Sequence, residues 1–223
     1  MKCIRCGRAA VIYQRYSGRH LCAEHLIADI ESRAKRVIRQ NQWLVRGDRI
    51  GVVSGLPGSA PLGMFLDHLV AERHDISIVR ICPPQSSGDT SRVAWYQRLS
   101  QMLSESGVTR IALSDCADDL AELTLYQVFT GDTDGLLSSG IPGLTLPYIQ
   151  PFREIPAEEL RIYYLHQPGV LTDGTTDYPP IVYRDRIWTD IHSLLEYFSS
   201  HHPSASHALR RYRDNLQSLV NAE

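Results

Sequence analysis

Three features that would assign a chain of 223 residues to a class at once are missing from this sequence. No apolar run approaches the ~18 residues of a membrane span, and the opening MKCIRCGRAA lacks the apolar centre of a secretory signal. The net charge is −2, so the chain as a whole presents no basic field toward nucleic acid. We therefore expect a cytoplasmic protein with no membrane or DNA partner, whose contacts with RNA are confined to a local surface.

Cysteine is also scarce, with five in the chain, yet three of them lie within the first 22 residues. Cys3 and Cys6 are separated by two residues, and Cys22 and His25 repeat that spacing further on. Two such pairs are typical of a tetrahedral structural zinc site, in which four protein ligands leave no open position for chemistry. The alternative is a set of reduced thiols beside an incidental histidine. We predict a Zn²⁺ knuckle whose intervening residues 9–21 form a hairpin.

The segment that follows, residues 26–44, carries apolar side chains at helical spacing. Basic residues lie among them at Arg33, Lys35, Arg36 and Arg39. Two interpretations stay open. The basic residues form either a solvated face of an amphipathic helix or an edge that faces the phosphates of RNA.

Beyond residue 47, short apolar runs alternate with longer segments of helical periodicity. The apolar runs predict strands at 48–54, 75–81, 108–114 and 144–152. The segments between them predict helices at 59–73, 91–107 and 116–131. This alternation is typical of an α/β fold with a doubly wound, mainly parallel sheet, which binds ligands at the carboxyl ends of its strands.

Glycine, proline and serine mark the segments that we expect to be irregular, at 82–90, 131–143 and 172–180. A short helix is predicted at 155–169, and two helices separated by HHPSAS fill residues 183–220. The resulting division is a zinc knuckle at 1–26, a connecting basic helix at 27–46, an α/β domain at 47–172 and a C-terminal helical segment at 173–223.

The stretch VVSGLPGSAPLG, residues 52–63, follows a predicted strand and leads into a helix, where nucleotide-binding proteins hold phosphate. It lacks the lysine and the spacing of a Walker loop. Ser54, Gly55, Gly58 and Ser59 remain as residues able to line a shallow anion site at the start of the helix.

Asp118 and Asp119 begin the helix predicted at 116–131. Carboxylates in the first turn of a helix are stabilised by its dipole, so helix capping is one interpretation, and a ligand site at the ends of the strands is the other. Cys82 and Cys116 follow predicted strands, and we expect both to be buried as small apolar side chains.

In this order of parts the chain resembles the PP-loop ATP pyrophosphatases that thiolate tRNA, the TtuA-like and cytosolic thiouridylase group. That family has a C-x2-C and C-x2-H knuckle, a strand that ends in S-G-G-x-D-S, and a later G-H-x-x-D-D-x-x-E-T motif. Here SGLPGS stands in place of the loop and SDCADDLAEL in place of the later motif, while IQPFREIPAEELRIYYL is similar to a third family segment. The resemblance implies a fold like that of the adenine nucleotide alpha hydrolases.

The departures from the family pattern fall on its chemistry. Leu56 replaces the second glycine of the loop, Gly58 replaces the aspartate, and Pro57 donates no N–H. The lost aspartate removes a carboxylate for Mg²⁺, so ATP with Mg²⁺ is an alternative rather than the expected ligand. The family's enzymes also hold an iron–sulfur cluster on cysteines. In this chain only Cys82 corresponds to one of those cysteines, and no cysteine follows Cys116. No iron–sulfur cluster is expected.

The resemblance therefore implies a catalytically degenerate PP-loop protein, which acts in tRNA 2-thiolation as a non-catalytic partner or tRNA-binding subunit. Its expected partners are tRNA and either an active thiolation-enzyme subunit or a second copy of the chain. One alternative is a nucleotide-dependent enzyme with altered chemistry, in which Gly58 makes room for a different ligand. Another is a protein-interaction module that docks through its knuckle and C-terminal helices.

Overall fold

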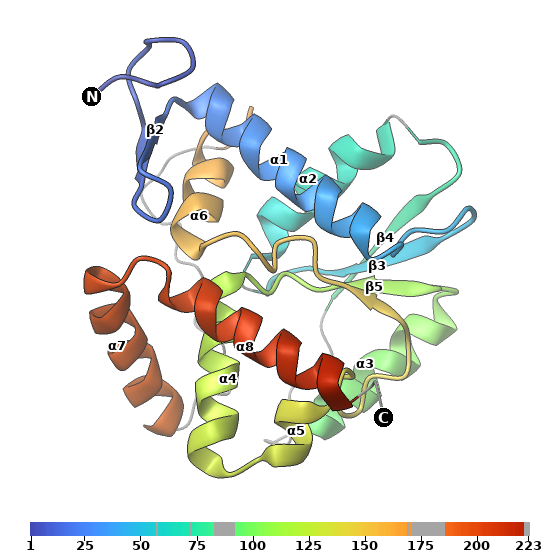
Figure 1. The fold of residues 1–223 in the computed structure, drawn as a ribbon. Helices are drawn as coiled ribbons and strands as arrows, with labels where there is room; N and C mark the ends of the chain where they lie inside the picture. The colour runs from blue at the N-terminus through green and yellow to red at the C-terminus, as the bar shows by residue number, and fades with distance from the viewer. Residues whose placement is uncertain (57, 72, 83–91, 169, 171–185, 221–223) are drawn as a thin grey trace.

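Four parallel strands form the central sheet of the computed structural model, which describes the chain except for residues 57, 72, 83–91, 169, 171–185 and 221–223 (Figure 1). The strands are β3 (Arg49–Val53), β4 (Ser77–Ile81), β5 (Arg110–Ala112) and β6 (Tyr148–Ile149). Their order in the sheet is β4-β3-β5-β6. The chain moves from β3 to β4 on one side and then to β5 on the other, so the order reverses between β3 and β5. The predicted doubly wound parallel sheet is confirmed.

Helices cover both faces of this sheet (Figure 1). Those that follow the strands are α2 (Ser59–Ala71), α3 (Arg92–Glu105), α4 (Ala117–Thr130), α5 (Thr133–Leu137) and α6 (Ala157–Leu165). On one face Ile50 and Val52 of β3 share a core with Phe65 of α2, and on the other Val53 shares a core with Leu99 of α3. Alternate side chains of β3 thus enter opposite cores, as a strand covered on both faces requires.

The N-terminal residues form the predicted hairpin, with β1 (Ile12–Gln14) antiparallel to β2 (Arg19–Leu21). Helix α1 (Ala23–Gln40) follows at once, so His25 lies in its first turn. The buried face of α1, together with Leu21 of the hairpin, belongs to the same core as Ile50 of the sheet. The knuckle is therefore packed onto the α/β part of the chain through a continuous apolar core.

The last two helices are α7 (Arg186–His201) and α8 (Ala205–Val220), separated near Pro203 as predicted. Helix α4 packs against α5, α7 and α8, and it ends at Gly131, which has a φ of 69°. Within the described residues, every helix is too short or too polar to span a lipid bilayer.

Helix α5 lies inside the segment expected to be irregular. Its first turn is capped by Asp132, whose carboxylate accepts a hydrogen bond from the Gly135 amide at 2.9 Å. Five residues are too few for helical periodicity to show in a sequence, which is why the element was missed. The predicted irregular segments at 82–90 and 172–180 lie almost wholly outside the described residues, as does residue 91, the first of the helix predicted at 91–107.

Candidate metal centre, phosphate loop and buried charge network

The four residues of the predicted zinc site lie together at the start of α1. Sγ of Cys22 lies 3.3 Å from Nδ1 of His25 and 3.6 Å from Sγ of Cys6. Sγ of Cys3 lies 3.5 Å from the same histidine nitrogen, and all four ligand atoms fall within 4.8 Å of one another. Ligands held at ~2.0–2.3 Å from a tetrahedral zinc ion are ~3.3–3.8 Å apart, so this donor set fits such an ion.

The local backbone favours the metal-binding form of one of these thiols, that of Cys3. Burial raises the pKa of the Cys3 thiol, but hydrogen bonds from the backbone of Cys22, Arg5 and Cys6 outweigh it and lower the pKa to about 6. Because metals bind the thiolate, a lowered pKa favours the binding form. Cys3 and Cys22 are buried whereas Cys6 is exposed, so one ligand faces the surface from which an ion enters.

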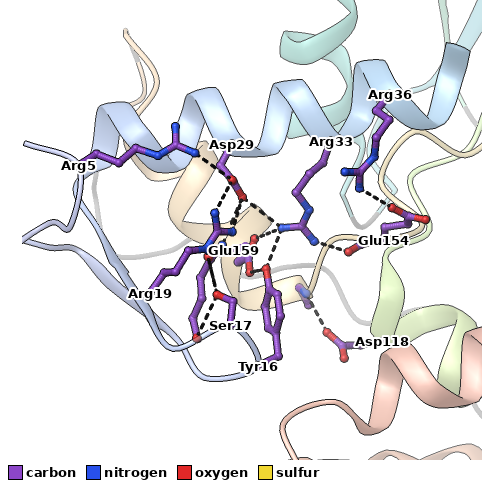
Figure 2. A network of polar contacts seen from close by, with 12 residues as sticks. Arg5, Tyr16, Ser17, Arg19, Asp29, Arg33, Arg36, Asp118, Glu154 and Glu159 are labelled. Carbon is purple, nitrogen blue, oxygen red and sulfur yellow. Dashed lines mark hydrogen bonds and ion pairs between the residues drawn. The ribbon is translucent and has the colours of Figure 1, made fainter.

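Beside the metal centre, a network of charged side chains joins the hairpin to α1 and α6 (Figure 2). Arg33 of α1 donates to Tyr16 Oη at 2.9 Å, to Glu159 Oε2 at 2.7 Å and to the carbonyl oxygen of Glu154. Tyr16 Oη in turn donates to Glu159 Oε1 at 2.6 Å. The Arg33 side chain is 12% exposed and that of Glu159 only 2%, so the pair is buried.

Asp29 of α1 is the second anion of this network (Figure 2). Its carboxylate lies 3.2 Å from Arg19, 3.5 Å from Arg33 and 3.7 Å from Arg5. Both sequence interpretations of the basic helix are therefore wrong for Arg33, which faces neither solvent nor an RNA edge. It was misassigned because its partner Glu159 lies 126 positions away in the chain.

Ser54, Gly55, Gly58 and Ser59 lie between the end of β3 and the start of α2. Gly55 and Gly58 have φ angles of 75° and 70°, which glycine adopts without strain. Both glycines therefore serve the turn from strand to helix, whatever the loop binds. Pro57 lies outside the described residues.

Some of the backbone donors at the start of α2 are already committed or missing. The Ser59 amide donates to the carbonyl oxygen of Leu56 at 3.0 Å, and the Leu62 amide donates to that of Gly58 at 3.1 Å. Pro61, the third residue of the helix, has no N–H. A helix N-terminus normally leaves four amide positions free, here those of residues 58–61, and two of these, Ser59 and Pro61, offer no N–H to an anion.

A small cavity of about 70 Å³ opens at the carboxyl ends of β3 and β5, where the strand order reverses. Leu56 and Ser59 of the loop, Trp95 of α3 and Asp115 after β5 are among its lining residues. This position is where doubly wound sheets bind ligands. Its volume is well below the ~300–1,000 Å³ of typical ligand pockets, and one wall carries a carboxylate.

Asp118 and Asp119 both have structural partners. Asp118 accepts hydrogen bonds from the Ala157 amide at 2.8 Å and from Ser206 Oγ at 2.5 Å, and so joins α4 to α6 and α8. Asp119 accepts one from the Cys116 amide at 2.9 Å. Burial, reinforced by the charge of Asp115, raises the pKa of Asp119 to about 6. These contacts favour the capping interpretation for Asp119 and an interhelical contact for Asp118.

The two cysteines outside the knuckle differ from each other. Cys116 is buried as expected, and burial raises the pKa of its thiol well above the ordinary value. Cys82 is exposed, so the expectation of a buried side chain is wrong there. It follows the last residue of β4, where the chain leaves the sheet and loses its cover.

Comparison with known proteins relates the chain to tRNA thiolation. Residues 2–27 match the N-terminal LIM domain of the 2-thiouridine synthetase TtuA. The chain is 48% identical over 46 residues to the tRNA 2-thiolation protein NcsA of Haloferax volcanii, and 41% identical over 66 residues to a probable sulfurtransferase of Methanocaldococcus jannaschii. These matches cover 21% and 29% of this chain, but only 14% and 19% of the two relatives.

In fold, the chain is similar to the U34-tRNA thiolase NcsA from Methanococcus maripaludis, a structure with a [4Fe-4S] cluster. The TM-score is 0.78 over 98% of this chain and 87% of the other, at 15% sequence identity. The predicted resemblance to the TtuA-like tRNA-thiolation group is confirmed. The chain is related to tRNA 2-thiolation proteins by sequence at its N-terminus and by fold over nearly its whole length.

The expectation that no iron–sulfur cluster is present is contradicted by this likeness, because a protein of the same fold carries one. The expectation rested on missing cysteines, most of whose expected positions lie in residues 83–91 and 171–185, outside the described part of the chain. A cluster also accepts ligands other than cysteine. Among the described residues only the knuckle gathers three or more metal-ligating side chains. The described residues therefore contain no ligand set for a cluster apart from the knuckle.

Proposed function

We propose that this chain is a tRNA-binding protein of the 2-thiolation system that does not adenylate tRNA itself. The match of residues 2–27 to a domain of the 2-thiouridine synthetase TtuA, the partial sequence match to a tRNA 2-thiolation protein and the fold shared with a tRNA thiolase support the tRNA part of the proposal. The aligned segments are a small part of each sequence relative, so activity and substrate do not carry over with them. The proposal therefore depends on the phosphate loop.

The loss of two amide donors at the start of α2, those of Ser59 and Pro61, carries the argument against adenylation. An adenylating enzyme must stabilise the charge of a leaving pyrophosphate, and preorganised N–H donors are the usual means. Here Ser59 spends its amide within the turn, and Pro61 has none. Gly58 stands where the resembled family has a metal-binding aspartate. The carboxylate of Asp115 in the cavity wall adds repulsion toward phosphate.

The proposed role of the knuckle is structural. Cys3, Cys6, Cys22 and His25 would hold one Zn²⁺, and four protein ligands leave no position for water or substrate. A segment of about 25 residues has too little apolar surface to fold by burial alone, so the ion would supply most of its folding free energy.

The second candidate function is a nucleotide-dependent enzyme with altered chemistry. The cavity beside Leu56, Trp95 and Asp115 favours it, since it occupies the ligand position of the fold and has an apolar wall against which a planar group could pack. The third candidate, a protein-interaction module, has no observation of comparable weight.

The decisive experiment measures AMP release and tRNA thiolation by protein purified without oxygen and reconstituted with iron and sulfide. That preparation keeps any cluster-dependent activity. With tRNA, ATP, Mg²⁺ and a sulfur donor present, we expect tRNA binding without AMP release or thiolation. Robust AMP release that depends on tRNA would reject the proposal.

Thermal denaturation with nucleotides separates the first two candidates. A ligand present at 100 times its Kd stabilises the folded state by about 2.7 kcal/mol. Stabilisation by a nucleotide with Mg²⁺ would favour the enzyme with altered chemistry, whereas stabilisation by tRNA alone supports the present proposal. Co-purification from the native host then shows whether an active thiolase subunit accompanies the chain.

A further inference from the structure

The hairpin of the knuckle has two faces of different character. Ile12 and Gln14 of β1 are buried, while Tyr13 between them has 49% of its surface exposed. His20 of β2 lies directly opposite Tyr13 in the strand register. The two rings stack, with centroids 4.5 Å apart and planes at 24°. Because strand pairing fixes both residues, the outer face of the hairpin presents a preformed aromatic stack to solvent.

The charge of this segment is opposite to that of the chain. The first 22 residues contain no aspartate or glutamate, although the chain as a whole has a net charge of −2. The basic residues of the segment are Lys2, Arg5, Arg8, Arg15 and Arg19. The aromatic stack therefore lies in a terminal segment whose formal side-chain charge is entirely positive.

Three of these cations are compensated by acidic residues of α1, namely Glu24 and Asp29. Arg15 donates at 2.5 Å to the carbonyl oxygen of Ser200, which is a neutral group. Over the residues that the structure describes, neither Lys2 nor Arg15 forms an ion pair. Within the described part of the chain, two positive charges of the hairpin segment therefore have no acidic partner and can meet an external anion.

We propose that the outer face of this hairpin binds a single-stranded stretch of RNA. One unpaired base continues the stack of Tyr13 and His20, and the adjoining phosphates lie against Lys2 and Arg15. This assignment rests on the proposed tRNA-binding function and specifies which surface performs it. An exposed aromatic ring accepts any base on its π-face, and unpaired loop bases are the usual targets of RNA-binding proteins. The excess positive charge favours this polyanion over a neutral protein surface.

The test compares binding of unfractionated tRNA and of a 12-nucleotide oligouridine by the full metal-loaded chain and its variants. Tyr13→Ala should weaken oligouridine binding roughly tenfold, because stacking on an aromatic side chain contributes of that order. Tyr13→Phe keeps the ring and should bind within about twofold of the unaltered chain. Tyr212→Ala is the matched control, since Tyr212 is 54% exposed on α8, far from the hairpin in the chain.

The charged residues are tested by the salt dependence of binding. Replacing Lys2 and Arg15 by glutamine should lower the slope of log Kd against log salt by about 0.7 for each phosphate that the variant no longer neutralises. Zinc content and far-UV circular dichroism, measured for every variant, identify any that fail to fold. If Tyr13→Ala fails to fold, the proposal is tested with Tyr13→Phe instead, which keeps the aromatic ring and must retain full affinity for oligouridine.

The outcomes distinguish this proposal from the function on which it rests. If the unaltered chain binds no tRNA, the proposed function fails. If it binds tRNA while Tyr13→Ala binds oligouridine as tightly as Tyr212→Ala does, the tRNA function stands and the hairpin surface is refuted. A weakened Tyr13→Phe variant with its zinc intact would also refute stacking as the mode of contact.

Discussion

Replacing Arg33 by methionine should destabilise the protein strongly, although the residue stands in a run of basic side chains that looks solvent-exposed in the sequence. The substitution keeps an unbranched apolar stem and removes the guanidinium that contacts Tyr16, Asp29 and Glu159. Among the described residues, it leaves the Glu159 carboxylate, which is 2% exposed, with only the Tyr16 hydroxyl as a hydrogen-bond partner.

The expected loss in the free energy of unfolding is about 3 kcal/mol at neutral pH. Breaking a buried ion pair by removing one partner costs ~3–5 kcal/mol, and the remaining hydrogen bond from Tyr16 places this case at the lower end. Replacing both Arg33 and Glu159 by methionine removes the uncompensated charge, so the double variant should lose less than Arg33→Met alone. Arg36→Met is the control, because its pair with Glu154 is largely exposed and contributes under ~1 kcal/mol.

The loss should also depend on pH in a defined direction. Burial raises the pKa of Glu159, and the charge of Arg33 opposes that shift. Without Arg33, the pKa of Glu159 in the folded state rises further above its pKa in the unfolded state. At pH values between these two pKa values, Glu159 is protonated in the folded state and ionised in the unfolded state. Stability of the variant is then retained at low pH and lost as pH rises through the folded pKa. Urea unfolding at pH 5 and pH 8 measures this. A deficit below 1 kcal/mol at pH 8, or one that grows toward pH 5, would refute the reasoning.

Three further predictions concern the metal centre, an acid and a strand. Cys22→Ala, or removal of the metal by a chelator, should lower the melting temperature of the whole chain and expose residues 1–25 to protease, because the knuckle shares its core with the sheet; an unchanged melting curve would contradict this. The pKa of Asp119 is raised to about 6, so its ionisation should cost the unaltered chain stability as pH rises from about 4 to 6, and Asp119→Asn should reduce that loss. Chemical unfolding across this pH range measures it, and an equal dependence of the unfolding free energy on pH in both proteins would contradict the prediction. Gly51→Ala should lower the free energy of unfolding by ~1–3 kcal/mol, because the new Cβ would lie 2.7 Å from Cδ2 of Leu103 in α3. Gly140→Ala is the control and should leave stability nearly unchanged. Equal denaturant midpoints for the two variants would contradict this prediction.

The fold was predictable because its determinants are local. Strand β3 spans Arg49–Val53 within a predicted 48–54, and α4 ends at Gly131 as its sequence indicates. Apolar period and turn residues report which side chains are buried, and burial decides the elements. The clustering of Cys3, Cys6, Cys22 and His25 was predictable for the same reason, since two pairs of ligand residues at fixed spacing are typical of a tetrahedral site without knowledge of the remaining chain.

The charge network was not predictable, because a sequence shows that a residue is basic but not what opposes it. Arg33 meets Glu159 only when α6 is folded against α1. The error on the iron–sulfur cluster has another origin. Missing cysteines were taken as evidence of a missing cofactor, and that expectation is contradicted by the likeness in fold to a thiolase that carries a cluster. The division into four segments is untested and stays a prediction.

The phosphate loop shows why a sequence motif and its function can separate. Gly55 and Gly58 keep the positive φ angles of a strand-to-helix turn, and that turn is required for α2 to pack on the sheet through Leu62 and Phe65. Selection for the fold alone therefore suffices to keep the glycines. Anion binding makes a separate demand, free amides at the start of the helix, and Pro61 removes one of them without disturbing the helix, because proline is tolerated in its first turn. A loop can thus keep its shape while its donors are spent, so the test of function in this chain lies in the amides rather than in the glycines.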